Sequence, residues 1–207
     1  MPSWKVHIEI AKRVNSKLNF KGKDLEEFMF GNILADINNG FIVEDVSVLY
    51  SHKYTHYEDN GGITYINFFN QYKKKIKEPT ILGYYIHLYT DYIWNNDYYT
   101  KVEKIVKMHN KTSEELKKIK HNDFKLYNCK YPINDIHITN INNIVNKSRL
   151  ISNISINNLD VEKTLEFLKK DNRLNYSYKF YTEGELDELL EYTIKRIIEL
   201  VKVYYIE

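Results

Sequence analysis

The sequence of 207 residues has almost no cysteine and no long apolar run. Cys129 is the single cysteine, so no internal disulfide can form and nothing points to an oxidising compartment. No window approaches the roughly 18 apolar residues that a membrane span needs. The first residues lead directly into an amphipathic pattern, without the apolar core of a signal peptide. We therefore expect a cytoplasmic protein without a transmembrane segment.

Helix-breaking residues are also scarce. With 7 glycines and 3 prolines, the chain favours long helices over many strands and turns. Apolar residues recur with helical spacing from Ser3 to Leu18, from Asp24 to about Ile37, and from Leu186 to Val201. Asp24 and Asp160 can each cap the start of a helix by accepting backbone hydrogen bonds.

Chain length limits how many hydrophobic cores the protein can hold. A chain of this size can bury one good core, but hardly two. We expect an all-α fold, a single compact multi-helix domain spanning 1–207, with a metal-site half at 1–95 and a helical C-terminal half at 96–207. Residues 121–135, which contain Pro132 and several asparagines, are expected to form a loop.

The helix expected from Ile81 to Trp94 is apolar on nearly all sides, yet it contains His87 and Asp91, four residues apart. This spacing puts both side chains on one helix face. An ionised aspartate in an apolar helix is costly unless something pairs with it. A metal ion, a His–Asp hydrogen bond and a basic partner all stay open as explanations. Gly83, one turn before His87, indicates the close approach of a metal, a substrate or a neighbouring helix.

Other segments supply further residues of the ligand type. His52 and His56 are followed by two acids, which suits either a metal site or a surface loop. His7 lies on an amphipathic face, where a satisfied core histidine is the usual explanation. Asp36 ends an apolar segment, where a helix-end aspartate is the simpler alternative. Together the candidate metal ligands are His7, Asp36, one of His52 and His56, His87 and Asp91. Such nitrogen and carboxylate donors suit zinc, with manganese or iron as alternatives.

These residues resemble the motifs of the zinc-dependent phospholipase C family, whose fold is also used by fungal-type single-strand nucleases. The matching pieces are an early-helix histidine at His7, Gly-Asn-Ile-x-x-Asp at 31–36, His-aromatic-x-Asp at 56–59, and Leu-Gly-x-x-x-His-x-x-x-Asp at 82–91. The resemblance covers about residues 1–95, and it favours His56 over His52 as the ligand.

The resemblance implies an all-α fold, bound zinc and phosphodiester hydrolysis. It implies that Asp36 is a metal ligand and the candidate general base. It further implies that His56, His87 and Asp91 bind one zinc ion. His7 would help to bind a second ion, with Asp91 as a bridge.

The sequence also departs from the family pattern. Secreted members use an N-terminal tryptophan amine as a ligand, whereas Trp4 is internal here. The position six residues after Asp91 is Asp97 instead of histidine, and His109 is followed four residues on by Ser113 instead of glutamate. We therefore expect one or two zinc ions, in a small intracellular bacterial-type relative.

The function expected from these residues is that of a metal-dependent hydrolase of phosphoesters or phosphodiesters, acting on a small-molecule or lipid substrate. A bound metal would lower the pKa of water, and Asp36 would orient or deprotonate that water. Several aromatic side chains either line a pocket or belong to the core, namely Tyr57, Tyr84, Tyr85, Tyr89 and Trp94.

Two other classes of protein compete with this function. A His-Asp phosphohydrolase needs an adjacent His-Asp pair, and no histidine here is followed by aspartate. A non-catalytic metal-binding helical module or scaffold stays open. The net charge of +2 gives no strong nucleic-acid signal, and the lysine-rich stretches at 73–77 and 117–120 are usually solvated helix faces. His109, His121 and His137 lie in polar surroundings and are expected to be exposed.

Overall fold

The computed structural model describes residues 2–39, 43, 46, 50–59, 62–106, 112–133, 136, 138–170 and 175–205. These residues form nine α-helices and two short 3-10 helices but no strand, with one isolated bridge between Asp59 and Gly62. The elements are α1 (Trp4–Leu18), α2 (Gly22–Leu34), η1 (Ile37–Asn39), α3 (His52–Thr55), α4 (Tyr65–Tyr72), η2 (Lys73–Lys75), α5 (Pro79–Val106), α6 (Ser113–Asn128), α7 (Ile141–Ser148), α8 (Asn158–Lys169) and α9 (Glu183–Tyr205). The expected all-α single domain is confirmed. None of the helices in these ranges combines the length and apolar character needed to cross a bilayer.

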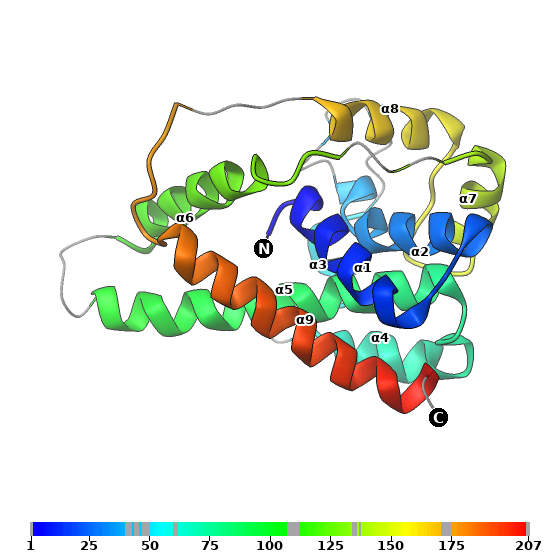
Figure 1. Ribbon diagram of the computed structural model, residues 1–207, viewed down its shortest axis with the longest axis horizontal. Coiled ribbons are helices and arrows are strands. Elements are labelled where there is room, and N and C mark those ends of the chain that lie inside the picture. Colours follow the sequence, from blue (N-terminus) through cyan, green and yellow to red (C-terminus); the bar gives the residue numbers. More distant parts are fainter. Residues whose placement is uncertain are drawn as a thin grey trace.

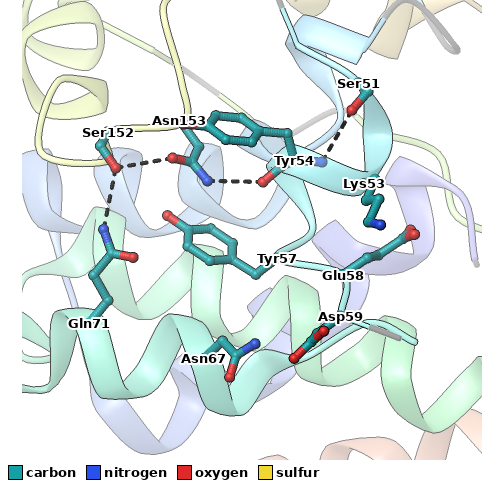
Figure 2. Close-up of a pocket in the computed structure, with 10 residues that line it drawn as sticks. All are labelled: Ser51, Lys53, Tyr54, Tyr57, Glu58, Asp59, Asn67, Gln71, Ser152 and Asn153. Carbon is teal, nitrogen blue, oxygen red and sulfur yellow. Dashed lines mark hydrogen bonds between the residues drawn. The ribbon is translucent and has the colours of Figure 1, made fainter. Parts of the chain in front are cut away.

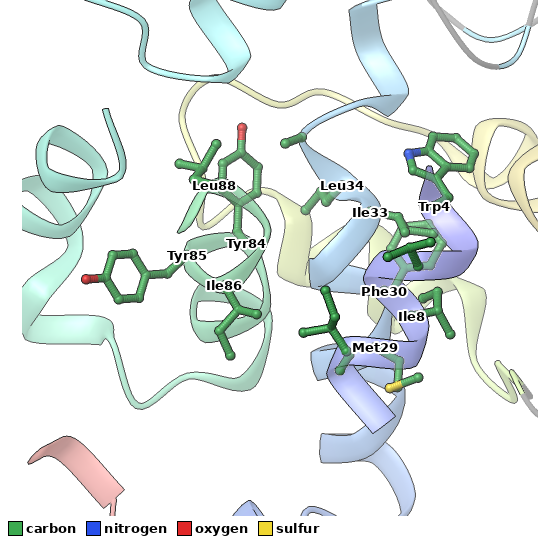
Figure 3. Packing of buried hydrophobic residues seen from close by; sticks show 14 of the residues in the cluster. Trp4, Ile8, Met29, Phe30, Ile33, Leu34, Tyr84, Tyr85, Ile86 and Leu88 are labelled. Atoms are coloured by element: carbon green, nitrogen blue, oxygen red, sulfur yellow. The ribbon is translucent and has the colours of Figure 1, made fainter. Parts of the chain in front are cut away.

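Helix α5 is the centre of the fold. Figure 1 shows it running along the molecule, with α9 crossing it and α1 and α2 lying beside each other. All side chains from Thr80 to Asp91 are buried, as the all-round apolar pattern of this segment predicts. Tyr84 stacks on Phe68 of α4 with ring centroids 4.8 Å apart, and Tyr85, which points away from α2, packs on Phe69 of the same helix (Figure 3). Of the five aromatic residues that the sequence left open between pocket and core, four are buried in the core, namely Tyr84, Tyr85, Tyr89 and Trp94.

Helices α2 and α5 make the most extensive helix–helix contact among the described residues, and glycines permit it. A Cβ atom on Gly83 would lie 2.4 Å from the carbonyl oxygen of Phe28. A Cβ atom on Gly31 would lie 2.6 Å from the carbonyl oxygen of Thr80. Gly83 therefore serves the packing of two helices, one of the alternatives that the sequence left open.

Two predicted helix caps are wrong by a few residues. Helix α2 begins at Gly22, so Asp24 lies in its first turn, where a carboxylate still suits the helix dipole. Helix α8 is capped by Asn157, and Asp160 completes the capping box from the third helical position. In both cases the acid stabilises the helix start from inside the helix.

The predicted loop at 121–135 is wrong for its first half, because α6 continues to Asn128. Phe124 and Tyr127 are buried and pack against Trp94 of α5, which favours helix despite the many asparagines. Buried Asp123 accepts backbone hydrogen bonds from residues 179, 180 and 181 at 2.7–3.0 Å, and so ties α6 to the segment before α9. The residues around Pro132 are outside any helix, as expected.

We predict that Gly83→Ala lowers the free energy of unfolding by about 1–3 kcal/mol or more, because the new methyl group would meet rigid backbone. Gly184→Ala in α9 is the matched control, since a Cβ atom added there would have no other atom within 4 Å. That control should be neutral or stabilising by up to about 1 kcal/mol. Denaturant unfolding of both variants measures the difference, and equal stabilities would contradict the packing role.

Candidate metal centre

The five predicted ligands converge on one place in the protein interior. His7 comes from α1, Asp36 follows α2, His56 follows α3, and His87 and Asp91 both lie in α5. None of the five is more than 3% exposed. Four separate segments therefore direct nitrogen and carboxylate donors into a single buried cluster.

Four of these side chains have the spacing of a tetrahedral ligand set. The Nε2 atoms of His56 and His87 lie 3.3 Å apart, and each lies 3.2 Å from Oδ2 of Asp91. Asp36 is the fourth member and faces the two rings with different oxygens, Oδ1 at 3.4 Å from Nε2 of His56 and Oδ2 at 3.7 Å from Nε2 of His87. A tetrahedral zinc ion at roughly 2.0–2.1 Å from its ligands would separate neighbouring ligand atoms by roughly 3.3–3.4 Å. The donor set therefore fits zinc in both chemistry and spacing.

Hydrogen bonds on the far side of each ring orient the two histidines. Nδ1 of His87 lies 2.7 Å from the carbonyl oxygen of Asn32, and Nδ1 of His56 lies 3.1 Å from that of His52. A carbonyl oxygen only accepts, so each Nδ1 carries a hydrogen and each neutral ring presents the lone pair of Nε2. Two nitrogen lone pairs and two carboxylates therefore face one another. A cation between them would stabilise these electron-rich groups.

His7 forms a second group with His87 and Asp91. Its ring stacks on that of His87 with centroids 4.1 Å apart, and its Nε2 lies 3.3 Å from Oδ1 of Asp91. Within the described residues, neither His7 nitrogen and neither Asp91 oxygen has a hydrogen-bond partner. Buried polar atoms of this kind are costly unless something else satisfies them.

Asp91 is placed to serve both groups. Its Oδ1 faces His7, whereas its Oδ2 faces His56 and His87. His87 cannot do the same, because its Nδ1 is already engaged with Asn32 and leaves only Nε2. The geometry thus suits one ion among four ligands, and it leaves His7 and Asp91 for a second.

The electrostatics of the cluster also favour a cation. Burial opposes ionisation of Asp91 and Asp36, but the neighbouring histidines hold the pKa of both carboxyls below the usual range. Burial likewise disfavours the charged form of His87, yet the carboxylates of Asp91 and Asp36 raise its pKa to about 9. Burial and the charge of His87 lower the pKa of His7 to about 4. Without metal, the cluster therefore retains a proton where a metal would bind.

The structure also shows supporting residues that the sequence did not reveal. The indole Nε1 of Trp4 donates to Oδ2 of Asp36 at 3.1 Å, so this internal tryptophan reaches the site through its side chain. His52 stacks on His56 with ring centroids 3.7 Å apart, and its own Nδ1 lies 2.7 Å from Oε1 of Glu58. His52 therefore supports His56 and does not replace it.

Among the remaining histidines, the structure describes His121. His121 is exposed on α6, as predicted. His109 and His137 lie outside the described residues.

We predict that the purified protein binds zinc and that His87→Ala weakens zinc binding more than about a hundredfold. Loss of a residue that only orients a ligand already costs about 10- to 100-fold, and His87 supplies a ligand nitrogen itself. His121→Ala, a matched change at an exposed position, should leave the zinc content unchanged. Elemental analysis and chelator competition measure both variants, and full zinc retention by His87→Ala would exclude this site.

Zinc affinity should also depend on pH in a defined direction. Because the pKa of His87 is about 9 in the metal-free protein, zinc must displace a proton below that pH. Lowering the pH by one unit between about 9 and about 7 should weaken zinc binding by about tenfold. Competition with a zinc dye across this range measures the slope, and a flat profile would argue against a proton held at His87.

A comparison with protein-family models matches residues 6–199 to the family described as zinc dependent phospholipase C. The match includes all five clustered residues, and it extends through the C-terminal half as well. No curated protein and no solved structure matches the chain. The family is one of zinc-dependent phosphodiester hydrolases, which agrees with a buried His/Asp cluster that could hold metal. With the match spanning nearly the whole sequence, the chain belongs to the zinc-dependent phospholipase C family.

Proposed function

We propose that the protein hydrolyses the phosphodiester bond of a phospholipid or a smaller phosphoester at the buried cluster. In this proposal His7, Asp36, His56, His87 and Asp91 are the metal ligands. The observation that carries the proposal is the convergence of two imidazole lone pairs and two carboxylates at 3.2–3.7 Å. The family match supports both the metal and the class of reaction.

The bound zinc would supply a water of lowered pKa and positive charge for the phosphoryl oxygens. Asp36 is proposed as the residue that accepts the proton of the attacking water. Burial opposes its ionisation, but His87 and His56 hold its pKa low, so Asp36 is ionised and can accept a proton from a water whose own pKa the zinc would lower. The bond from Trp4 to Oδ2 fixes the orientation of this carboxylate.

The net charge of the cluster with bound metal affects which substrate it can attract. The cluster contributes two carboxylates, Asp36 and Asp91, which one divalent ion would neutralise. A second ion, between His7 and Asp91, would leave a net positive charge that attracts an anionic phosphodiester. We therefore favour two ions in the active form.

The location of the protein stays a prediction from the sequence. We propose a cytoplasmic, intracellular family member, a proposal supported by the single cysteine, Cys129.

Asp36→Asn tests the proposed base directly. The substitution retains the size of the side chain but removes its basicity, so kcat should fall by about 10²- to 10⁴-fold. Asp24→Asn, an exposed aspartate in α2, is the matched control and should keep full turnover. Hydrolysis of a generic phosphodiester and of phospholipid vesicles, with zinc content measured in parallel, is the assay. Undiminished turnover by zinc-loaded Asp36→Asn would refute the assignment, and a zinc-loaded wild type with no turnover would favour a non-catalytic metal module.

A further inference from the structure

A hollow of about 610 Å³ lies on the outer side of the segment that carries His56. Its lining joins α3, the residues after it, one face of α4 and two residues of the connection between α7 and α8. The lining residues are Ser51, Lys53, Tyr54, Tyr57, Glu58, Asp59, Asn67, Gln71, Ser152 and Asn153 (Figure 2).

The charges around the hollow exclude several classes of ligand. Lys53 is the single cation of the lining and stands against Glu58 and Asp59, so a phosphate or other anion is disfavoured. A quaternary cation such as choline carries a single hydroxyl group, so it cannot use several hydrogen-bond acceptors at once and suits the lining less well than a polyol does. Each of the ten lining residues carries a hydroxyl, amide or charged group, which does not suit an acyl chain.

The hydrogen bonds within the lining further limit the chemical class of the ligand. The amide of Asn153 donates to the carbonyl oxygen of Tyr54 at 2.9 Å and accepts from Ser152 at 3.1 Å, while Gln71 donates to Ser152 at 3.3 Å. These bonds hold Gln71, Ser152 and Asn153 in place as one wall of the hollow, and they use mainly the N–H and O–H donors of these side chains. The side-chain oxygens of Gln71, Asn67 and Asp59 have no hydrogen-bond donor among the described residues, and each can accept from a ligand.

Two aromatic rings complete the hollow. Figure 2 shows Tyr54 and Tyr57 between the amide wall of Gln71, Ser152 and Asn153 and the charged side chains opposite. Tyr54 is 51% exposed, and one face of its ring stacks on Tyr50 with centroids 5.2 Å apart, which leaves the other face for a ligand. An apolar ring face beside several acceptors matches a molecule with C–H faces and many hydroxyl groups.

The hollow is also connected to the metal centre. Tyr57 directly follows His56 and has φ of 54°, a left-handed conformation that costs an aromatic residue roughly 1–2 kcal/mol. This turn lets His56 point inward while Tyr57 faces the hollow. Glu58 lies in the lining and bonds His52, whose ring stacks on His56.

From these observations we propose that the hollow is a binding site for a neutral polyol, such as an inositol, a glycerol or a sugar. The polyol would donate hydroxyl hydrogens to Asn67, Gln71 and Asp59 and accept from Lys53. Its role as the head group of the hydrolysed lipid rests on the proposed function, whereas the binding itself does not.

Calorimetric titration of the zinc-loaded full chain with myo-inositol, glycerol, choline and inorganic phosphate tests the site. We expect saturable binding of myo-inositol or glycerol, and neither choline nor phosphate should bind at the hollow. Asn67→Ala and Asp59→Ala should each weaken polyol binding about tenfold, as loss of a hydrogen bond to a ligand does. Asn70→Ala, on the same helix but outside the lining, should bind as the wild type does.

Competition assays then separate the two sources of a polyol. Competitive inhibition of phosphodiester hydrolysis by myo-inositol would identify the site as the head-group subsite. Binding without inhibition would identify a site for a free polyol. The proposal is overturned when neither polyol binds, when choline or phosphate binds in a way that Asn67→Ala and Asp59→Ala weaken, or when these two variants bind polyol as tightly as Asn70→Ala. Because titration needs no turnover, failure of the enzymatic proposal would leave this result interpretable.

Discussion

The close approach of α2 and α5 is the contact that holds both fold and site together. Gly31 and Gly83 let the two backbones meet without intervening side chains. Asn32 follows Gly31 directly, and its carbonyl oxygen thereby reaches Nδ1 of His87 at 2.7 Å. The same contact that closes the core therefore fixes which nitrogen of His87 faces the metal.

The cluster gathers carboxylates and imidazole nitrogens whose burial would each cost free energy if they stood alone in the interior. Asp36 and Asp91 are buried carboxylates, and the nitrogens of His7 have no hydrogen-bond partner among the described residues. The apolar packing around α5 supplies the stability that holds these groups together. Since a metal would satisfy them only in the folded state, its binding free energy would also stabilise the fold.

The segment from His52 to Asp59 connects the metal centre to the surface. His56 points inward, His52 stacks behind it, and Tyr57 and Glu58 face the hollow. Ser152 and Asn153 close the hollow from the C-terminal half, which also packs α9 against α1 and α5. The family match likewise runs to residue 199, well beyond the motifs within 1–95.

The helical fold and the five clustered residues could be predicted from the sequence alone. Scarce glycine and proline and helical periodicity predict the helices, and the all-round apolar helix by itself makes His87 and Asp91 candidate ligands. His7 and the choice of His56 over His52 depended on the resemblance to the family motifs. The packing of the helices was needed to establish that Gly83 serves helix contact, that His52 supports His56, and that Trp4 reaches Asp36. Periodicity reports the apolar face of one helix, whereas these three contacts depend on how separate segments meet. The helix at 121–128 was missed for the same reason, because distant partners such as Trp94 and the backbone of 179–181 stabilise it.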